Sequence, residues 1–487
     1  MITESCTVHF ETLGCKLNQI ESEAAAKAFS DSGFLVDVMP CTASVEENNN
    51  IFLCIINTCT VTAKAEQKAR RLIRLLLEKF PCAAILVTGC YAEVEPEEIR
   101  AISDRIAVLK GTEKEYLSKL PSIIKSQLFS QSQTEHSSRP CDLPVSLIQD
   151  GLSPEKLAAF LNKVLAQVPA EDLRKASFTL ATDTFLSHSR ASIKIQDGCN
   201  CNCAYCRIHI ARGKSVSLPA SEVLSRVRSL EKAGQCEVVI TGVNLSQYYS
   251  AAEKMRFPEL MEFLIENTST IAFRISSLYP DIVTADFCKI LSSDRVRPHF
   301  HLSVQSGSDK ILKSMNRPYK SHDVIEASHM LRKIKPDCFL AADIITGFPG
   351  ETDGDFAQSM ELTRQCDFSW VHVFPFSPRP GTAAYSMRPQ VPQSVSGERA
   401  RQLKALAVAQ KKCFLENSLG KQFKAIIEKR RINEIRAVSE NFIHIRINDY
   451  KRQDLKSLGG KEVTVQISRI LPARSQTESV EAEAFLV

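Results

Sequence analysis

The segment SIKIQDGCNCNCAYC, residues 192–206, joins a predicted buried strand to a loop that carries closely spaced cysteines. Cys199, Cys203 and Cys206 follow the pattern C-x3-C-x2-C. Three such thiols are well placed to ligate three irons of a 4Fe–4S cluster, which normally takes four cysteines. The fourth iron is then open to a ligand that is not protein, as a catalytic metal site requires. From the spacing alone, a zinc site and a chance group of cysteines remain as alternatives.

Length and composition describe a globular protein of several domains. At 487 residues the chain is too long for one ordinary core, and two to four domains are expected. The first residues lack the pattern of a secretory signal, and no apolar window of about 18 residues is present, so we expect a cytoplasmic protein without membrane association. In that compartment the 17 cysteines stay reduced and available to metals.

The first 125 residues alternate between predicted strands, at 8–13, 51–57 and 83–88, and predicted helices, at 19–32 and 63–79. Cys15, Cys59 and Cys90 each follow one of these strands closely. The carboxyl ends of parallel strands form one edge of a sheet, where ligands bind, so the three cysteines are expected to converge on a second metal site. The alternative is that they are small buried residues in turns.

A second series of strands begins near residue 190, with candidates at 192–196, 237–241, 273–276, 299–304, 339–345 and 370–374. Helical stretches separate them, and six βα units predict a partial barrel with its function at the carboxyl ends of the strands. Several segments rich in glycine and polar residues follow these strands. They are TGVN at 241–244, VQSGS at 304–308, ITGFPGET at 345–352 and SPRPGT at 377–382. Ordinary turns are the alternative for each one.

The cysteine segments resemble those of the methylthiotransferases, a family of radical S-adenosylmethionine (SAM) enzymes. TLGCKLN at 12–18, NTCTVT at 57–62 and TGCYA at 88–92 are similar to the three cysteine motifs of the N-terminal domain of that family. The resemblance implies two 4Fe–4S clusters. One binds SAM at its open iron, and the other, auxiliary cluster carries or supplies the sulfur. The implied metal ligands are Cys199, Cys203 and Cys206 for the first cluster and Cys15, Cys59 and Cys90 for the second.

The same resemblance implies residues along the SAM pocket, namely Tyr205, Gly242, Asn244, Gln305, Ser306 and Gly307. Arg212 occupies a family position close to the clusters. The chain departs from its relatives at His209, where proline is frequent, and at Cys201, an additional cysteine between the ligands. Because the position of Cys201 breaks the ligand spacing, we interpret it as a bystander that could compete for iron.

The remaining segments are predicted to connect the domains and to bind RNA. A linker rich in Ser, Gln and Thr leads to an amphipathic helix that begins near Ser153, and its apolar stripe is expected to pack within the protein. Residues 421–474 hold 13 lysines and arginines against 6 acidic residues, a balance of +7, which leaves −2 for the rest of a chain of net charge +5. The short strands predicted there resemble a TRAM-type RNA-binding barrel. Its predicted RNA contacts are Arg430, Arg431, Arg436 and Arg446. A solvated charged surface is the alternative.

Together these features predict an α/β fold with four segments. We expect an N-terminal parallel α/β sheet domain at 1–125, a linker with one helix at 126–189, a six-unit βα partial barrel at 190–416 and a small β-barrel at 417–487.

Short signatures indicate the substrate within the family. KLN after Cys15 resembles the branch that acts on threonylcarbamoyladenosine, whereas the isopentenyladenosine branch more often has QMN there. The branch that modifies a ribosomal-protein aspartate more often has QHAS where this chain has QSGS at 305–308. The resemblance implies radical methylthiolation of C2 of the adenine, and none of the ten histidines is an obvious acid or base.

The predicted activity implies the partners. They are the anticodon stem-loop of a tRNA and a reductant such as a flavodoxin or ferredoxin, and we expect a monomer. Methylthiolation of isopentenyladenosine, modification of a ribosomal-protein aspartate and a non-catalytic iron–sulfur module that binds RNA are the alternatives.

Overall fold

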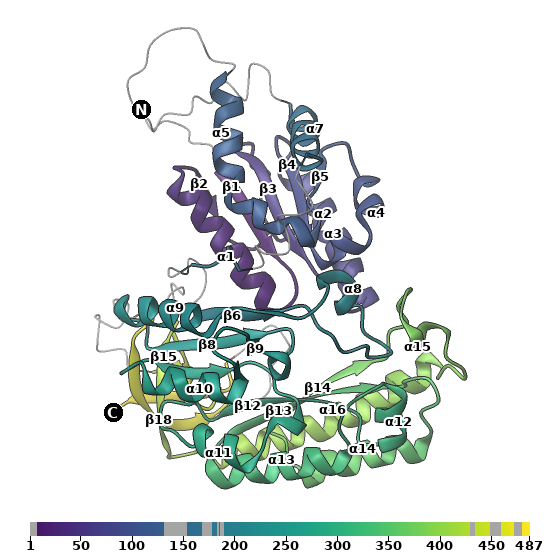
Figure 1. The fold of residues 1–487 in the computed structure, drawn as a ribbon, viewed down its shortest axis with the longest axis vertical. Helices are drawn as coiled ribbons and strands as arrows, with labels where there is room; N and C mark the ends of the chain where they lie inside the picture. Colours follow the sequence, from purple (N-terminus) through teal and green to yellow (C-terminus); the bar gives the residue numbers. More distant parts are fainter. Residues whose placement is uncertain are drawn as a thin grey trace. The chain divides into compact units, whose positions relative to one another are not determined.

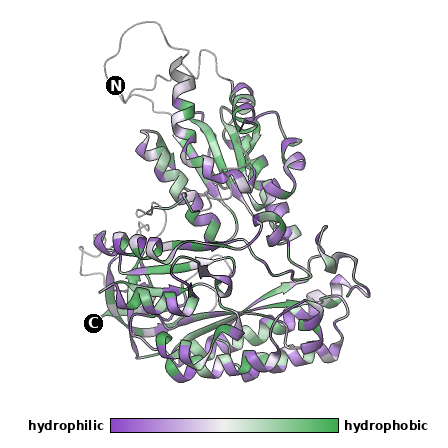
Figure 2. Ribbon diagram, in the orientation of Figure 1, coloured by the Kyte–Doolittle hydropathy of each residue, from purple (hydrophilic) through white to green (hydrophobic). Residues whose placement is uncertain are grey.

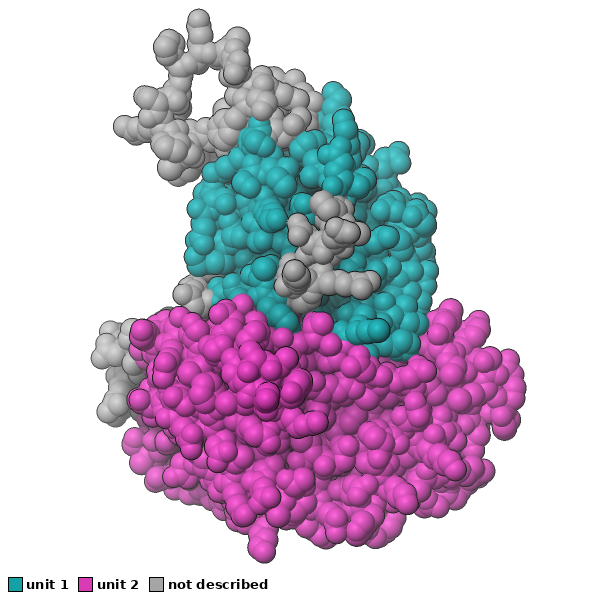
Figure 3. All heavy atoms as spheres, viewed as in Figure 1, with its two compact units in different colours: residues 1–186, 197–199, 207–214 teal, residues 187–196, 200–206, 215–487 magenta. Residues whose placement is uncertain are grey.

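The computed structural model describes residues 7–130, 153–167, 178–182, 185, 189–428, 434–448, 459–471 and 480–487. The chain divides into two compact units (Figure 3). The first contains residues 1–186, 197–199 and 207–214, and the second contains residues 187–196, 200–206 and 215–487. Among the described helices, none has the length and apolar character that a membrane crossing needs.

A five-stranded parallel sheet forms the centre of the first unit, in the order β2-β1-β3-β4-β5 (Figure 1). The two central strands, β3 and β4, are buried along their whole length, as expected for apolar strands covered on both faces. The three strands predicted from the sequence are confirmed, and two short strands are added. The bounds are β1 Thr7–Thr12, β2 Leu35–Asp37, β3 Ile51–Thr58, β4 Ala84–Gly89 and β5 Ile106–Val108.

Helices cover both faces of this sheet, and their apolar stripes form two separate cores. The predicted linker helix is confirmed as α7, where the Ser153 hydroxyl accepts a hydrogen bond from the Lys156 amide, and Leu157 and Leu161 are buried in the first core. The helices of the unit are α1 Lys16–Asp31, α2 Ala63–Lys79, α3 Cys90–Val94, α4 Pro96–Arg100, the 3-10 helix η1 Gly111–Ser118, α5 Leu120–Ser130, α7 Pro154–Leu165 and α8 Ile208–Arg212.

Six parallel strands build the partial barrel of the second unit, and all six were predicted from the sequence. Together with the additional two-residue strand β7, they form two sheets, β11-β8-β6-β7 and β12-β13-β14. Two isolated bridges, Phe273 with Val296 and Leu278 with Leu302, join the sheets between β11 and β12. The bounds are β6 Ala191–Asp197, β7 Val216–Ser217, β8 Glu237–Gly242, β11 Ala272–Ile275, β12 His299–Gln305, β13 Phe339–Thr346 and β14 Trp370–Pro375.

Amphipathic helices follow the strands, with hydrophilic residues outward and apolar residues toward the sheets (Figure 2). They are α9 Ala220–Lys232, α10 Phe257–Glu266, α11 Ala285–Leu291, α12 Asp309–Ser314, α13 Ser321–Ile334, α14 Asp353–Gln365, α15 Ala383–Ser386 and α16 Gln393–Glu416. Short elements complete the unit, namely the 3-10 helices η2 Leu245–Gln247 and η3 Pro280–Ile282 and the hairpin of β9 Tyr249–Ser250 and β10 Met255–Arg256.

The C-terminal strands close into the predicted small barrel, in the order β15-β16-β17-β19-β18. Phe442, just before β17, has a φ of +66° and lies outside the strand. The bounds are β15 Gln422–Ile427, β16 Ile435–Ser439, β17 His444–Ile447, β18 Glu462–Ile470 and β19 Ala482–Leu486.

A buried ion network ties this small barrel to the amino ends of the strands of the partial barrel. Glu237, the first residue of β8, accepts hydrogen bonds from Arg274 at 2.7 and 3.0 Å and from Arg297 at 2.9 Å. Arg297 also pairs with Glu462 of β18, and the Arg274 guanidinium lies 5.5 Å from the centre of the Phe442 ring. Charge and aromatic contacts therefore hold the two barrels of the second unit together.

Candidate functional site

The three N-terminal cysteines lie at the ends of three adjacent strands. Cys15 follows β1, Cys59 follows β3 and Cys90 follows β4, and these strands are neighbours in the sheet. Gly14 has a φ of +110°, and a Cβ built there would lie 3.2 Å from the Cys59 sulfur, so glycine lets the first cysteine loop approach the second. Burial raises the pKa of Cys59 to about 11, so a nearby cation is needed to hold it as a thiolate.

Two asparagines of the cysteine motifs fix these loops. The Asn18 side chain donates to the Leu13 carbonyl at 2.8 Å and to the Thr58 carbonyl at 3.1 Å, which links the loops after β1 and β3. The Asn57 side chain donates in return to the Asn18 carbonyl at 3.2 Å. The motif residues around the cysteines thus have a structural task, because they hold the backbone that carries the thiols.

A charge-balanced group of buried side chains lies beside Cys90. Arg212 donates to Asp197 at 2.9 Å and to Glu21 at 3.2 Å, and Lys114 lies 2.6 Å from the same Glu21 carboxylate. Burial raises the pKa of the Cys90 thiol, and the positive charge of Arg212 partly offsets this rise. The family resemblance predicted Arg212 near the clusters. It did not indicate that Glu21 and Lys114 join Arg212, since both residues lie far from Arg212 along the chain.

The C-x3-C-x2-C loop follows β6. Cys199 belongs to the first compact unit, where its amide donates to the Gly213 carbonyl at 3.0 Å. Cys203 and Cys206 belong to the second unit, and the Cys206 amide donates to the Cys203 carbonyl at 3.0 Å. In the same unit the additional cysteine, Cys201, accepts hydrogen bonds from the side chains of Asn244 at 3.7 Å and Gln247 at 3.0 Å.

A partly buried arginine outside the motifs identified from the sequence contacts a predicted cluster ligand. Arg317 Nη1 lies 3.3 Å from Cys203 Sγ and 2.9 Å from the Tyr279 hydroxyl. Its guanidinium lies 4.1 Å from the centre of the Tyr279 ring and 4.8 Å from that of Tyr319. The hydroxyl of Tyr205, a predicted SAM contact, is 3.5 Å from the same nitrogen. Aromatic rings and hydrogen bonds therefore fix one positive charge next to a thiol.

The other predicted SAM contacts lie where strands end. A Cβ on Gly242 would be 2.9 Å from Gln196 Oε1, and that oxygen also accepts a hydrogen bond from the Asn244 amide at 2.8 Å. Gln305 is the last residue of β12 and has a φ of +72°, which is unusual for a residue other than glycine. A Cβ on Gly307 would be 2.6 Å from the Gln358 carbonyl, so this glycine is required by packing.

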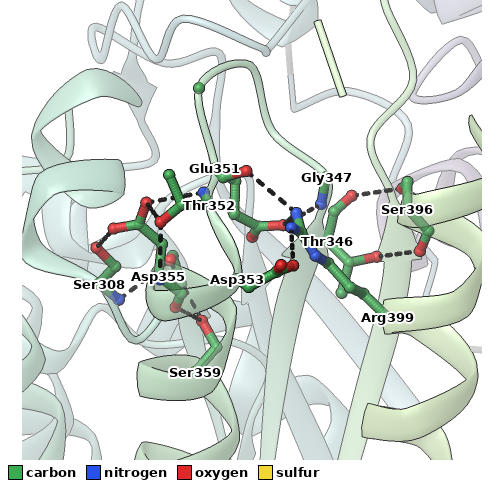
Figure 4. Close-up of polar contacts among 12 residues, drawn as sticks. Ser308, Thr346, Gly347, Glu351, Thr352, Asp353, Asp355, Ser359, Ser396 and Arg399 are labelled. Carbon is green, nitrogen blue, oxygen red and sulfur yellow. Dashed lines mark hydrogen bonds and ion pairs between the residues drawn. The ribbon is translucent and has the colours of Figure 1, made fainter. Parts of the chain in front are cut away.

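Two polar networks hold the loop after β13 (Figure 4). Glu351 accepts from the Gly347 amide at 2.7 Å and pairs with Arg399 of α16 at 2.7 Å. Asp355 accepts from Ser308 at 2.8 Å and from Thr352 at 2.7 Å, so it joins the loop after β12 to the start of α14. Ser306, a predicted SAM contact, is linked to this network through Ser308, because its hydroxyl accepts a hydrogen bond from the Ser308 amide at 3.2 Å.

The predicted RNA contacts are described only in part. Arg430 and Arg431 lie outside the described residues. Arg436 and Arg446 are partners across β16 and β17, and both pair with Glu434. The Arg436 side chain is only 12% exposed and that of Arg446 is 34% exposed, so Arg446 is the more accessible of the two.

Comparison with known proteins gives the family. Residues 193–363 match the model of the radical SAM superfamily, and residues 7–111 match that of Uncharacterized protein family UPF0004. The chain is 42% identical to the threonylcarbamoyladenosine tRNA methylthiotransferase of Treponema pallidum, over 95% of this chain and 98% of that protein.

Two further relatives separate the branches of the family. The threonylcarbamoyladenosine tRNA methylthiotransferase of Thermotoga maritima is 31% identical over 94% of this chain and 96% of its own length. A tRNA-2-methylthio-N(6)-dimethylallyladenosine synthase of Polynucleobacter asymbioticus is 29% identical over 98% of this chain and 99% of its own length. The chain therefore belongs to the radical SAM methylthiotransferases, in the branch of the threonylcarbamoyladenosine tRNA methylthiotransferases.

Proposed function

We propose that this protein transfers a methylthio group to C2 of N6-threonylcarbamoyladenosine beside the anticodon of tRNA. The observation that carries the proposal is a sequence identity of 42%, over 95% of this chain, to a relative named for this substrate, against 29% identity to a relative of the dimethylallyladenosine branch. The KLN signature at 16–18 supports the same substrate, and Asn18 has a task in holding the first cysteine loop.

We further propose that two 4Fe–4S clusters and SAM are the cofactors. The ligands of the auxiliary cluster are Cys15, Cys59 and Cys90, which is supported by their position at the ends of three adjacent strands. Those of the second cluster, which binds SAM, are Cys199, Cys203 and Cys206. When bound, these groups supply the radical chemistry that removes hydrogen from C2 and delivers a methylated sulfur.

The chain's own residues orient these groups and the substrate. Arg317 fixes the Cys203 thiolate, Asn244 and Tyr205 contact SAM, and segment 305–307 lies along the SAM pocket. No group of the chain has to move a proton in this reaction, because the hydrogen leaves C2 as an atom. The four arginines Arg430, Arg431, Arg436 and Arg446 contact tRNA phosphates, which position the RNA without reading its sequence.

The working form that we propose is a cytoplasmic monomer. A flavodoxin or ferredoxin supplies the electron, since the cofactors need a strong one-electron reductant. The anticodon stem-loop is the part of the tRNA that is bound, and its adenosine is nearly single-stranded, so unstacking costs roughly a few kcal/mol.

Nucleoside mass spectrometry of tRNA from cells with and without this gene tests the proposal. We expect 2-methylthio-N6-threonylcarbamoyladenosine to vanish on deletion, to return with the wild-type gene and to stay absent with Cys203→Ala. The matched control is Cys413→Ser, which changes an exposed cysteine far along the sequence from any proposed ligand and should restore the nucleoside in full. An unchanged amount of this nucleoside after deletion would refute the proposed substrate, and loss of the isopentenyl product in the same trace would indicate the other tRNA branch.

A further inference from the structure

Three polar side chains gather on adjacent strands of the partial barrel, and none of them belongs to a cysteine motif. They are His301 of β12, Asp343 of β13 and His372 of β14, and Asp343 and His372 are direct partners in the parallel register. Successive side chains of a strand alternate between the two faces of a sheet. On β12 the neighbours Phe300 and Leu302 are buried, whereas His301 is partly exposed. The three polar groups therefore share the less buried face of this three-stranded sheet.

The ligand atoms of these side chains lie close together. His301 Nε2 is 3.2 Å from Asp343 Oδ1, and one nitrogen or oxygen from each of the three residues lies within 4.8 Å of the others. The Ser277 hydroxyl lies 2.8 Å from His301 Nδ1. When the Ser277 hydroxyl accepts a hydrogen bond from Nδ1–H, the lone pair of His301 is on Nε2, the atom that faces Asp343. A hydrogen bond to the second ring nitrogen usually fixes metal-binding histidines in the same way.

We propose that His301, Asp343 and His372 bind one divalent transition-metal ion such as Zn²⁺, Mn²⁺ or Fe²⁺, at a site separate from the cysteine sites. Two imidazoles and one carboxylate are a donor set that suits these ions, and three protein ligands leave coordination positions open. With metal–ligand bonds of about 2.0–2.2 Å, the ligand atoms of a tetrahedral site lie about 3.4 Å apart. His301 Nε2 and Asp343 Oδ1 already meet this distance, so only the His372 nitrogen has to approach, by roughly 1 Å. The exposed His372 can supply that movement.

A simple hydrogen-bonded pair does not account for the third residue. Asp343 would satisfy His301 alone, whereas His372 brings a further nitrogen to the same point. The Trp370 indole nitrogen lies 3.3 Å from His372 Nδ1, which marks that nitrogen as an acceptor in the metal-free protein. Binding of a metal through Nε2 places the proton on Nδ1 instead, so this contact must change when the ion binds.

That contact provides a specific optical signal. Trp370 is the single tryptophan of the chain, and its ring centre lies 6.2 Å from that of His372. A paramagnetic Co²⁺ ion on His372 should quench the fluorescence of Trp370. The experiment uses protein with its clusters reconstituted, so that the cysteines are occupied, and titrates it with Co²⁺ while the bound metal is counted. We expect quenching that saturates at one equivalent and is reversed by Zn²⁺.

Two variants test the ligands, and one serves as a control. Asp343→Asn preserves the shape of the side chain, and His372→Ala truncates an exposed one; each should weaken Co²⁺ binding at least tenfold. His322→Ala removes an exposed histidine that pairs with Glu326 on α13, and it should bind Co²⁺ as the wild type does. Iron content and cluster absorbance report whether each variant is folded.

Either of two results would overturn the proposal. One is a wild-type protein whose Trp370 fluorescence does not respond to millimolar Co²⁺. The other is a His372→Ala variant that still binds one equivalent with unchanged affinity. Because no tRNA enters the experiment, its outcome is independent of the proposed substrate.

Discussion

At the scale of single residues, Arg317 is the side chain with the most direct effect on the proposed chemistry. Its guanidinium donates to Cys203 Sγ at 3.3 Å and to the Ser303 carbonyl at 3.1 Å, while Tyr279 lies against its face. Hydrogen bonds to ligand sulfurs and nearby charge set the potential of an iron–sulfur cluster. A fixed positive charge stabilises the reduced, more negative state.

We therefore expect Arg317→Met to lower the reduction potential of the proposed cluster on Cys203 by on the order of 60 mV, a tenfold change for one electron. A redox titration followed by electron paramagnetic resonance measures it. Arg401→Met is the matched control, because the side chain of this arginine of α16 is 78% exposed. The cluster of this variant should have the same reduction potential as that of the wild type. An unchanged potential in Arg317→Met would mean that the contact with Cys203 has no electrostatic role.

The residues that sequence reasoning found and missed differ in how far their partners lie along the chain. The cysteines and asparagines of the motifs are contiguous in sequence, so their pattern is visible without a structure. Arg317 meets Cys203 across 114 residues, and the group at His301, Asp343 and His372 needs the register of three strands. Asp343 is the only charged residue of the apolar strand β13, a signal that could have directed attention to that face.

At the scale of elements, helix α16 holds the loop after β13 through one buried ion pair. Arg399 Nη1 lies 2.7 Å from Glu351 Oε2, and both side chains are almost fully buried. Arg399 Nη2 lies 2.7 Å from Asp353 Oδ1, but the Asp353 side chain is 99% exposed. The same arginine thus makes one buried pair and one surface pair.

Removal of the two pairs should have very different effects. Arg399→Met leaves the Glu351 charge buried without its partner, and we expect a loss of about 3–5 kcal/mol in the free energy of unfolding. Asp353→Asn removes only the exposed partner and should cost about 0–1 kcal/mol. Urea unfolding of both variants makes the comparison. Equal losses in the two would show that the Glu351 pair does not stabilise the loop.

Elements were predicted well where burial makes the sequence apolar. The strands β3 and β4 are apolar runs, and helix α2 was predicted at its observed bounds. The six strands of the partial barrel were predicted to within one residue at each end. β2 and β5 are three residues long, too short for a periodic pattern. β16 and β19 of the small barrel each carry one charged residue, Arg436 and Glu483, which interrupts the apolar pattern of a short strand.

At the scale of the whole molecule, the network around Glu237 couples the stability of the second unit to pH. Burial alone would raise the pKa of Glu237, but the charges of Arg274, Arg190 and Arg297 outweigh it and lower the pKa to about 2. Since its ordinary value is 4.5, the stabilising effect is complete above that pH and is lost as the pH falls from about 4.5 to 2.

The shift corresponds to about 3 kcal/mol, at 1.36 kcal/mol per pKa unit. Other carboxyl groups titrate in the same range, so the difference between wild type and Glu237→Gln is the quantity to measure. In urea unfolding of cluster-free protein, we expect this difference to shrink by about that amount between pH 5 and pH 2. A constant difference across this range would contradict the assigned pKa.

The interruption between β11 and β12 makes the partial barrel two half-shells rather than one continuous wall. At the Leu278 bridge, backbone hydrogen bonds run from the Leu278 amide to the His301 carbonyl at 2.8 Å and from the Ser303 amide to the Leu278 carbonyl at 2.9 Å. Each contributes on the order of 1 kcal/mol, much less than a full ladder between strands. The half-shells can therefore part along this line, and we expect its amide hydrogens to exchange with solvent before those of the ladders on either side.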